Sequence, residues 1–299
     1  MKKQFLALAV LATMGVGAYS QATDTIAKVK ASGEITMGVR DSSGALSYTL
    51  GDGKYAGYHV EICQRIIANL EKVVGKKVAV KYLSVTSQNR IPLVQNGTVD
   101  IECGSTTNNA TRQKDVAFAL TTFVEEVRMA VKATSGITSI TQLNGKSVAT
   151  TTGTTSVQML RKNQRANGID FKEVFGKDHA ESFLLLESGR ADAFVMDGSI
   201  LAGNIANAKN PADFKIVGEV LSVEPIAIMM RKGDPAFKKL ADDTIREMAK
   251  SGEIAKLYDK WFMQAIPPKN TKVGLAASAS IKAAWATPND KPMEDYAKK

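Results

Sequence analysis

The sequence lacks any apolar run long enough to cross a membrane. A transmembrane helix needs about 20 consecutive apolar residues, and the main apolar run, residues 5–16, is shorter than that. Two lysines precede this run and small residues follow it at 18–20, which is typical of a cleavable secretory signal. We therefore expect residues 1–22 to be a signal peptide. No cysteine follows to accept a lipid, so we expect a soluble, released periplasmic protein.

Cysteine and histidine are scarce, at two residues each. His59 and His179 lie far apart and no cluster has metal-ligand spacing, so we expect no metal site. In an exported chain two cysteines are more often paired than free, because the periplasm is oxidising. We therefore expect a disulfide between Cys63, on a predicted helix, and Cys103, at the end of a predicted strand. Two buried free thiols, acting as small apolar side chains, are the alternative.

Long runs of like charge and nucleotide-binding motifs are also missing. The formal net charge is +9, but lysines and arginines are interspersed with acidic residues, so we expect no nucleic-acid partner. Neither the phosphate-binding loop Gly-x-x-x-x-Gly-Lys nor the dinucleotide fingerprint Gly-x-Gly-x-x-Gly is present, and we expect no cofactor. A basic surface modestly favours an acidic ligand.

What the sequence does contain is a regular alternation of short β-rich runs and helical stretches. This alternation predicts parallel α/β sheets. The first set has strands at 35–39, 78–83 and 99–103 with helices at 58–74 and 89–96. The second has strands at 147–150, 171–174 and 193–197 with helices at 156–167, 179–188 and 199–208. Two α/β lobes are implied, followed by an extended stretch (215–231), a helical segment (235–264) interrupted at Gly252, and a polar tail that wraps a lobe.

Hydroxyl, glycine and cationic residues follow the predicted strands directly. In open α/β sheets, ligands bind beyond the carboxyl ends of the strands. These segments are 40–44, 84–90, 104–107 with Arg112, 151–155, 177–179 and 197–198. Residues 153–156 also open a helix, whose free N–H groups and dipole can receive an anion. A plain helix cap is the alternative for that step.

The order and spacing of several motifs resemble one known family. The motifs are Gly-Tyr-His-Val-Glu-Ile (57–62), Ile-Pro-Leu-Val-Gln-Asn-Gly (91–97) with Asp100, Ser-Thr-Thr (105–107) with Arg112, Leu-Asn-Gly-Lys (143–146), Gly-Thr-Thr (153–155), Gly-Arg-Ala-Asp-Ala (189–193) with Asp197, and Gly252 with Lys-Trp-Phe (260–262). Together they resemble the periplasmic solute-binding proteins of polar amino-acid ABC importers, and within them the branch for glutamate and aspartate. The resemblance covers about residues 30–265.

This resemblance implies a two-lobed periplasmic binding protein clamshell of type II. Lobe 1 would comprise residues 23–124 and 223–299, and lobe 2 residues 125–222. Two hinge strands would lie near 123–126 and 221–225. The protein would act as a monomer and deliver its ligand to an inner-membrane ABC permease.

The resemblance also implies roles for the residues after the strands. The ligand α-carboxylate would be held by Arg112, with hydroxyls and N–H groups at Thr107 and Thr155. The α-ammonium would meet Asp197 and Ser105. A planar guanidinium matches a carboxylate through two parallel hydrogen bonds, and a fixed carboxylate can match an ammonium.

Arginines at two further positions predict an acidic ligand. Arg40 and Arg90 would face the ligand side chain, where relatives that bind basic amino acids look to have an aspartate and an apolar residue. With His179 and Ser87 at the same end, these cations need an anion between them. Thr152 completes the predicted ligand-binding set. Many relatives carry a bulky aromatic residue in the first loop that covers the ligand. Residues 42–45 contain no aromatic residue, and Tyr48 is the candidate for this role.

Two other function classes share the expected fold. An exported dehydratase-type enzyme acting on a small carboxylic acid would need a general acid or base free to transfer a proton. Here Asp197 and His179 are expected to be occupied by ligand charges, so we favour a non-enzymatic receptor. A signalling receptor module would require a transmembrane segment, which the sequence lacks.

Overall fold

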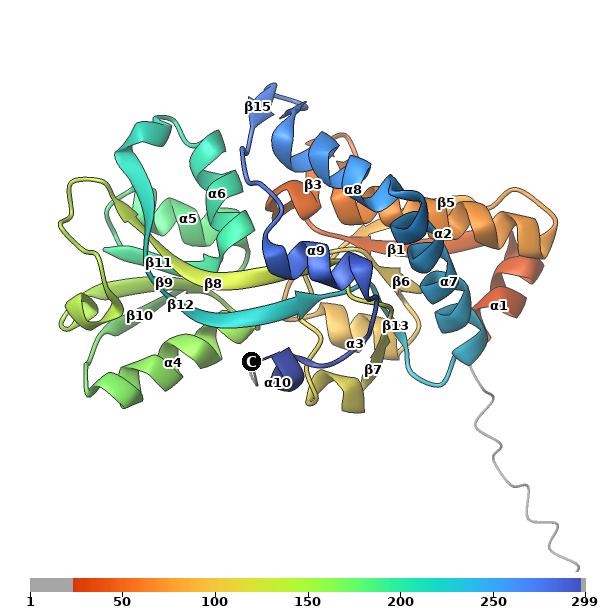
Figure 1. The fold of residues 1–299 in the computed structure, drawn as a ribbon, viewed down its shortest axis with the longest axis horizontal. Helices are drawn as coiled ribbons and strands as arrows, with labels where there is room; N and C mark the ends of the chain where they lie inside the picture. Colours follow the sequence, from red (N-terminus) through yellow and green to blue (C-terminus); the bar gives the residue numbers. More distant parts are fainter. Residues whose placement is uncertain (1–23, 297–299) are drawn as a thin grey trace, which may run out of the picture.

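The computed structural model describes residues 24–296, which form two lobes, each built on a five-stranded mixed sheet (Figure 1). The expected signal peptide lies outside the described residues. The first sheet has the strand order β5-β1-β6-β13-β7. Its strands are β1 (Glu34–Val39), β5 (Ala79–Ser84), β6 (Ile101–Glu102), β7 (Val116–Phe118) and β13 (Met229–Arg231).

The second sheet repeats this arrangement with the order β10-β9-β11-β8-β12. Its strands are β8 (Phe123–Lys132), β9 (Ser147–Thr151), β10 (Lys172–Gly176), β11 (Ala193–Asp197) and β12 (Phe214–Ile226). In each sheet three neighbouring strands are parallel and the last two are joined antiparallel. The predicted parallel strands are therefore present, and the segments that connect the lobes add the antiparallel ones.

Strands β8 and β12 form the two-stranded hinge. They pair antiparallel from Val127 opposite Ser222 to Phe123 opposite Ile226. In Figure 1 both strands extend between the second sheet, on the left, and the first sheet, in opposite chain directions. The expected two-lobed clamshell with two hinge strands is confirmed.

Helices cover both sheets. They are α1 (Thr25–Ser32), α2 (Tyr58–Val74), α3 (Arg90–Gln95), α4 (Thr155–Asn167), α5 (His179–Glu187), α6 (Gly198–Asn207), α7 (Pro235–Ser251), α8 (Glu253–Tyr258), α9 (Ala279–Ala286) and α10 (Met293–Tyr296). The predicted interruption at Gly252 is present, because this residue has a left-handed φ of 77° between α7 and α8. None of the helices in residues 24–296 is long and apolar enough to cross a membrane.

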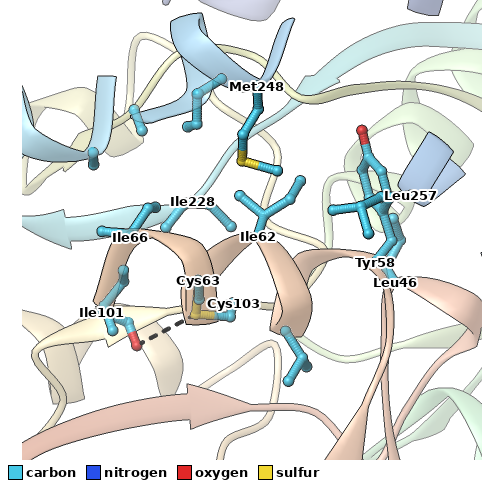
Figure 2. Packing of buried hydrophobic residues seen from close by; sticks show 14 of the residues in the cluster. Leu46, Tyr58, Ile62, Cys63, Ile66, Ile101, Cys103, Ile228, Met248 and Leu257 are labelled. Atoms are coloured by element: carbon cyan, nitrogen blue, oxygen red, sulfur yellow. Dashed lines mark hydrogen bonds between the residues drawn. A yellow bond between two sulfur atoms is a disulfide. The ribbon is translucent and has the colours of Figure 1, made fainter. Parts of the chain in front are cut away.

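The core of the first lobe lies under α2. Buried Tyr58, Ile62, Ile66 and Leu70 recur at a spacing of four, so they share one face of the helix. Cys63 on this helix is bonded to Cys103, just after β6, with a Cα–Cα distance of 6.4 Å (Figure 2). The predicted disulfide is therefore confirmed. It joins the helix to the strand that leads into the candidate site.

The polar tail packs along the first lobe and the hinge. Helix α9 lies against β8 (Figure 1), and Trp285 on this helix donates a hydrogen bond of 2.9 Å to the Thr122 carbonyl at the start of the hinge. Several features went unrecognised in the sequence. They include α1, a small sheet of β2 (Ser42–Ser43), β3 (Ser47–Gly51) and β4 (Lys54–Ala56), strand β7, the pair of β14 (Ala265–Ile266) and β15 (Thr271–Lys272), and α10.

Candidate ligand-binding site

The predicted ligand residues gather where the carboxyl ends of the two sheets meet. From the first sheet, Arg40 follows β1, Ser87 and Arg90 follow β5, and Ser105, Thr107 and Arg112 follow β6. From the second, Thr152 and Thr155 follow β9, His179 begins α5, and Asp197 ends β11. Nine of these ten residues are at most 8% exposed, and Thr152 is half-buried. Loops that are far apart in sequence thus form one buried polar cluster.

Direct contacts between the lobes show that the clamshell is closed around this cluster. The Nη2 atom of Arg112 donates to the Gly153 carbonyl at 3.5 Å, and the hydroxyls of Thr107 and Thr155 are 3.2 Å apart. Ser42 also donates a hydrogen bond to Asp178. Each of these contacts joins a residue that follows a strand of one sheet to a residue that follows a strand of the other.

Gly153 permits a close backbone approach between the lobes. It has a φ of +81°, and a Cβ at this position would lie 2.8 Å from the Cα of Gln88 across the cleft. Both the left-handed backbone and the close contact require glycine. The Gly-Thr-Thr segment therefore meets two requirements: the close contact between the lobes and the start of helix α4.

Arg40 and Arg90 form a cationic end of the site. Arg90 is 2% exposed, and in residues 24–296 its guanidinium makes one hydrogen bond, from Nη1 to the Ser105 carbonyl at 3.3 Å. Arg40 donates through Nη2 to Ser87 Oγ at 2.9 Å and through Nη1 to Ser105 Oγ at 3.4 Å. The Nε atoms of both arginines are buried and have no hydrogen-bond partner among the described residues. Burial, followed by the neighbouring Arg112 and Arg40 cations, lowers the pKa of Arg90 well below its usual value.

His179 contacts Arg40 across the cleft. Its Nε2 lies 3.1 Å from Arg40 Nη2, and its Nδ1 lies 3.0 Å from Thr151 Oγ1. Arginine can only donate, so Nε2 accepts and the ring proton is on Nδ1. Burial and the cations of Arg40 and Arg90 lower the pKa of His179 well below its usual value, which keeps the imidazole neutral. His179 therefore orients Arg40 without adding a third cation at this end.

Arg112 and the start of helix α4 form a second place for an anion. The Nη1 atom of Arg112 donates to the Thr107 carbonyl at 2.8 Å, which fixes the guanidinium beside the helix. The residue before the helix, Thr154, donates its hydroxyl to the Thr151 carbonyl at 2.8 Å and does not cap the helix. The first N–H groups of a helix have no acceptor within it. A carboxylate can therefore bind between Arg112 and these groups.

Asp197 forms the opposite, anionic end of the site. It is 2% exposed, and its Oδ1 atom is buried with no hydrogen-bond partner in the part of the chain that the structure describes. Burial, followed by the nearby carboxylates of Glu125 and Glu224, raises its pKa well above the usual value, against the opposing effect of Arg90 and Arg112. An ammonium group beside Oδ1 would satisfy this oxygen and offset the repulsion among the carboxylates.

Comparison with known proteins shows the family to which the chain belongs. Residues 35–264 match the family of bacterial extracellular solute-binding proteins, family 3. The chain belongs to this family. It is 46% identical to the L-glutamate/L-aspartate-binding protein of Pseudomonas aeruginosa, over 91% of each chain. It is 43% identical to the glutamate/aspartate import solute-binding protein of Escherichia coli, over 96% of this chain and 98% of the relative.

Among solved structures, a mutant of ArgBP from T. maritima has the same fold. The TM-score is 0.71 at 28% sequence identity, over 80% of this chain and 99% of that one. The sequence and the fold therefore both agree with membership of this family of solute-binding proteins.

Three buried carboxylates of this solute-binding protein were missed in the sequence. Glu125 and Glu224 lie on the hinge strands, and Glu102 ends β6; all three are at most 2% exposed. Glu125 and Glu224 occur within the two predicted hinge segments. An acidic residue in a strand otherwise rich in apolar residues is the signal that could have pointed to them.

Tyr48, the expected lid, lies outside the polar cluster. Its hydroxyl donates to the Pro267 carbonyl at 2.7 Å and its ring packs edge-on against Trp261 at 6.1 Å. It lines an outer groove with Asp41 and Lys269, in which none of the ten predicted ligand residues takes part. Within the part of the chain that the structure describes, no group of three or more His, Cys, Asp or Glu side chains could hold a metal ion.

Proposed function

We propose that this protein is the periplasmic substrate-binding component of an ABC importer for acidic amino acids, L-glutamate or L-aspartate. Lobe 1 (23–124 and 223–299) and lobe 2 (125–222) close on the ligand by motion at the hinge. The closed form, acting as a monomer, then delivers the ligand to an inner-membrane permease. Export depends on the signal peptide at residues 1–22.

The observation that carries this proposal is the state of Arg90. Its guanidinium has five N–H donors, is 2% exposed, and makes a single hydrogen bond among the described residues. An unpaired buried charge is strongly unfavourable. A carboxylate between Arg90 and Arg40 would supply both acceptors and a counter-charge, and an acidic side chain provides that carboxylate.

The remaining groups match the main-chain part of an amino acid. Arg112 and the N–H groups at Thr155 would hold the α-carboxylate. Asp197, with Ser105, would hold the α-ammonium. Ser87 and His179 would keep Arg40 aimed at the side-chain carboxylate, and Thr152 would line the cleft beside them. Because the two ends of the site carry opposite charge, the ligand can bind in only one direction.

The relatives support import over catalysis. Proteins 46% and 43% identical to this chain carry names that describe binding or import of glutamate and aspartate. The dehydratase alternative needs a group free to transfer a proton, whereas the lone pair on His179 Nε2 is directed at Arg40. One methylene contributes only about 1 to 3 kcal/mol in a pocket, so we propose the pair of acidic amino acids as the ligand class.

Titration calorimetry against the twenty amino acids tests the proposal. The protein is first unfolded, which releases any ligand carried through purification, and is then refolded. We expect glutamate or aspartate to bind with a dissociation constant near 1 μM or below, which corresponds to about −8 kcal/mol. Glutamine and asparagine should bind at least about 10-fold more weakly. Equal affinity for glutamate and glutamine would contradict the proposal.

A further inference from the structure

The hinge carboxylate Glu224 makes an unusual set of hydrogen bonds. It is fully buried on β12. Its Oε2 atom accepts from Thr107 Oγ1 at 2.7 Å and from Thr155 Oγ1 at 2.6 Å. Its Oε1 atom accepts from Ser222 Oγ at 2.7 Å. Thr107 follows a strand of the first sheet and Thr155 begins a helix of the second lobe, so one carboxylate oxygen joins the two lobes at the hinge.

This bonding changes what the two threonines can offer a ligand. A threonine hydroxyl has one proton to donate, and here both protons are directed at Glu224. The hydroxyls therefore cannot also donate to a ligand α-carboxylate in this arrangement. The donors left for that group are the N–H groups at the start of α4 and the Arg112 guanidinium. Glu224 thus determines which part of each threonine faces the ligand.

The opposite hinge strand provides an internal comparison. Glu125 lies directly across from Glu224 in the strand register and is also buried. Both of its oxygens accept from a single residue, Ser199, through the hydroxyl and the backbone N–H. Ser199 lies in α6 of the second lobe. Separating the lobes would leave these bonds intact, whereas it would remove the Thr155 hydroxyl from Glu224.

Glu224 also balances charge beside Arg112. Burial lowers the pKa of Arg112, and Glu224 is the first of the carboxylates that oppose this effect, ahead of Asp197 and Glu102. In the closed form Glu224 therefore stabilises the cation that receives the α-carboxylate. In an open form, water would replace the hydroxyl of Thr155 at Oε2.

We propose that Glu224 is a positioning residue that couples closure of the hinge to ligand capture, by accepting one hydroxyl from each lobe only when the cleft is shut. It acts on the ligand through Thr107, Thr155 and Arg112. The proposal rests on the proposed function in one respect, that an amino acid binds in the cleft. It does not depend on which amino acid that is.

The main test compares Glu224→Gln with Glu126→Gln, a matched change on the neighbouring hinge strand where the side chain is 49% exposed. Calorimetry should show that Glu224→Gln weakens glutamate binding by about 10- to 100-fold, the effect of losing hydrogen bonds to a charged group. Stopped-flow dissociation should be correspondingly faster. Small-angle scattering should show a smaller ligand-induced decrease in the radius of gyration. Glu126→Gln should change the affinity by less than about 2-fold.

A double-mutant cycle separates positioning from general stability. Thr155→Val removes the hydroxyl from the second lobe, and its effect on affinity should be strongly non-additive with Glu224→Gln, because both changes break the same bond. The ligand-free melting temperature of Glu224→Gln should stay close to that of the wild-type protein, because in the open form water replaces the Thr155 hydroxyl at this position. A merely structural role would lower this temperature and leave affinity nearly unchanged.

Wild-type affinity and closure in Glu224→Gln would overturn the proposal, as would an additive cycle. If Glu224→Gln did not fold, Thr155→Val alone would decide the question. Wild-type dissociation kinetics and closure in this variant would overturn the proposal, and faster dissociation would support it. If the wild-type protein bound another amino acid in place of glutamate, the proposed function would fail, and the same variants would be measured with that ligand.

Discussion

The cationic and anionic ends of the site differ in what holds their charges in place. At the cationic end, Arg40 and Arg90 are buried beside each other, and no salt bridge within residues 24–296 joins either of them to a carboxylate. At the anionic end, Glu125 and Glu224 accept hydrogen bonds from hydroxyl groups, and among the described residues Asp197 Oδ1 is buried without a partner. In the proposed binding mode, the ligand would supply a counter-charge to both buried arginines at the cationic end and to Asp197 at the anionic end.

This difference indicates how selectivity and closure are divided. Unpaired guanidinium groups discriminate between a side-chain carboxylate and a neutral amide, because an amide brings N–H donors to groups that also only donate. In the proposed mechanism, Glu224 on the hinge responds to lobe motion, and Asp197 would receive the ammonium that every amino acid carries. Changes at the cationic end should therefore alter specificity, whereas changes elsewhere should weaken all amino acids together.

The largest effect is expected at Arg112, which lies between the two ends. Arg112→Ala would leave the α-carboxylate without its main partner in a buried cleft, with an expected loss of about 2 to 5 kcal/mol. Calorimetry should show glutamate and glutamine weakened by the same factor. Arg112→Lys, which keeps the charge but loses the two parallel hydrogen bonds, should weaken both ligands less. Near-normal binding by folded Arg112→Ala would refute this role.

A somewhat smaller, selective effect is expected at the cationic end. Arg90→Leu should weaken glutamate by about 1.5 to 3 kcal/mol, the contribution of hydrogen bonds to a charged group, and glutamine far less. The ratio of the two affinities, measured by calorimetry, should fall toward one. Arg40→Ser should act in the same direction, and the double variant should be less than additive because both groups share one ligand carboxylate.

If both single variants still close on ligand and keep the wild-type ratio of glutamate to glutamine affinity, the proposed difference between the two ends is refuted. Small-angle scattering with saturating glutamine provides the closure control, because glutamine keeps the main-chain contacts at Arg112 and Asp197.

The anionic end should show a non-selective effect. Asp197→Asn keeps the shape of the side chain but removes the charge opposite the α-ammonium, with an expected loss of about 1 to 3 kcal/mol. Calorimetry should find this loss equal for glutamate, aspartate and glutamine. Selective weakening of glutamate alone would mean that Asp197 contributes to side-chain recognition and would abolish the contrast.

A separate effect, on stability and not on affinity, concerns pH and the hinge. Burial raises the pKa of Glu125 from 4.5 to about 7, so between these values the folded protein holds a proton that the unfolded chain has lost. The contribution of Glu125 to the free energy of unfolding therefore falls as pH rises through this window, by up to about 1.4 kcal/mol per pH unit.

Glu125→Gln mimics the protonated form at every pH and isolates this contribution. Urea unfolding of both proteins at pH 4.5 and pH 8, with saturating glutamate, should show the variant gaining stability relative to wild type at the higher pH. Histidines titrate in the same range, but they are common to both proteins and cancel in the difference. Parallel pH profiles would show that Glu125 does not titrate in this range.

Much of the fold followed from local patterns in the sequence. The spacing of apolar residues in α2 and the alternation of strands with helices predicted both lobes, because each pattern reflects one face buried against a sheet. The polar residues after each strand predicted the place of the site. In α1 and the β2–β4 sheet, apolar residues do not recur with a strong period. These elements were missed because they lack that signal.

The sequence by itself determined the fold class, the disulfide partners and most of the polar residues that gather between the lobes. Only the tertiary structure decided how these groups are paired: that His179 faces Arg40, that Arg90 makes a single hydrogen bond within residues 24–296, and that Glu224 joins a hydroxyl from each lobe. The physical reason is that burial and hydrogen bonding between distant segments depend on how the lobes close, which no local pattern encodes.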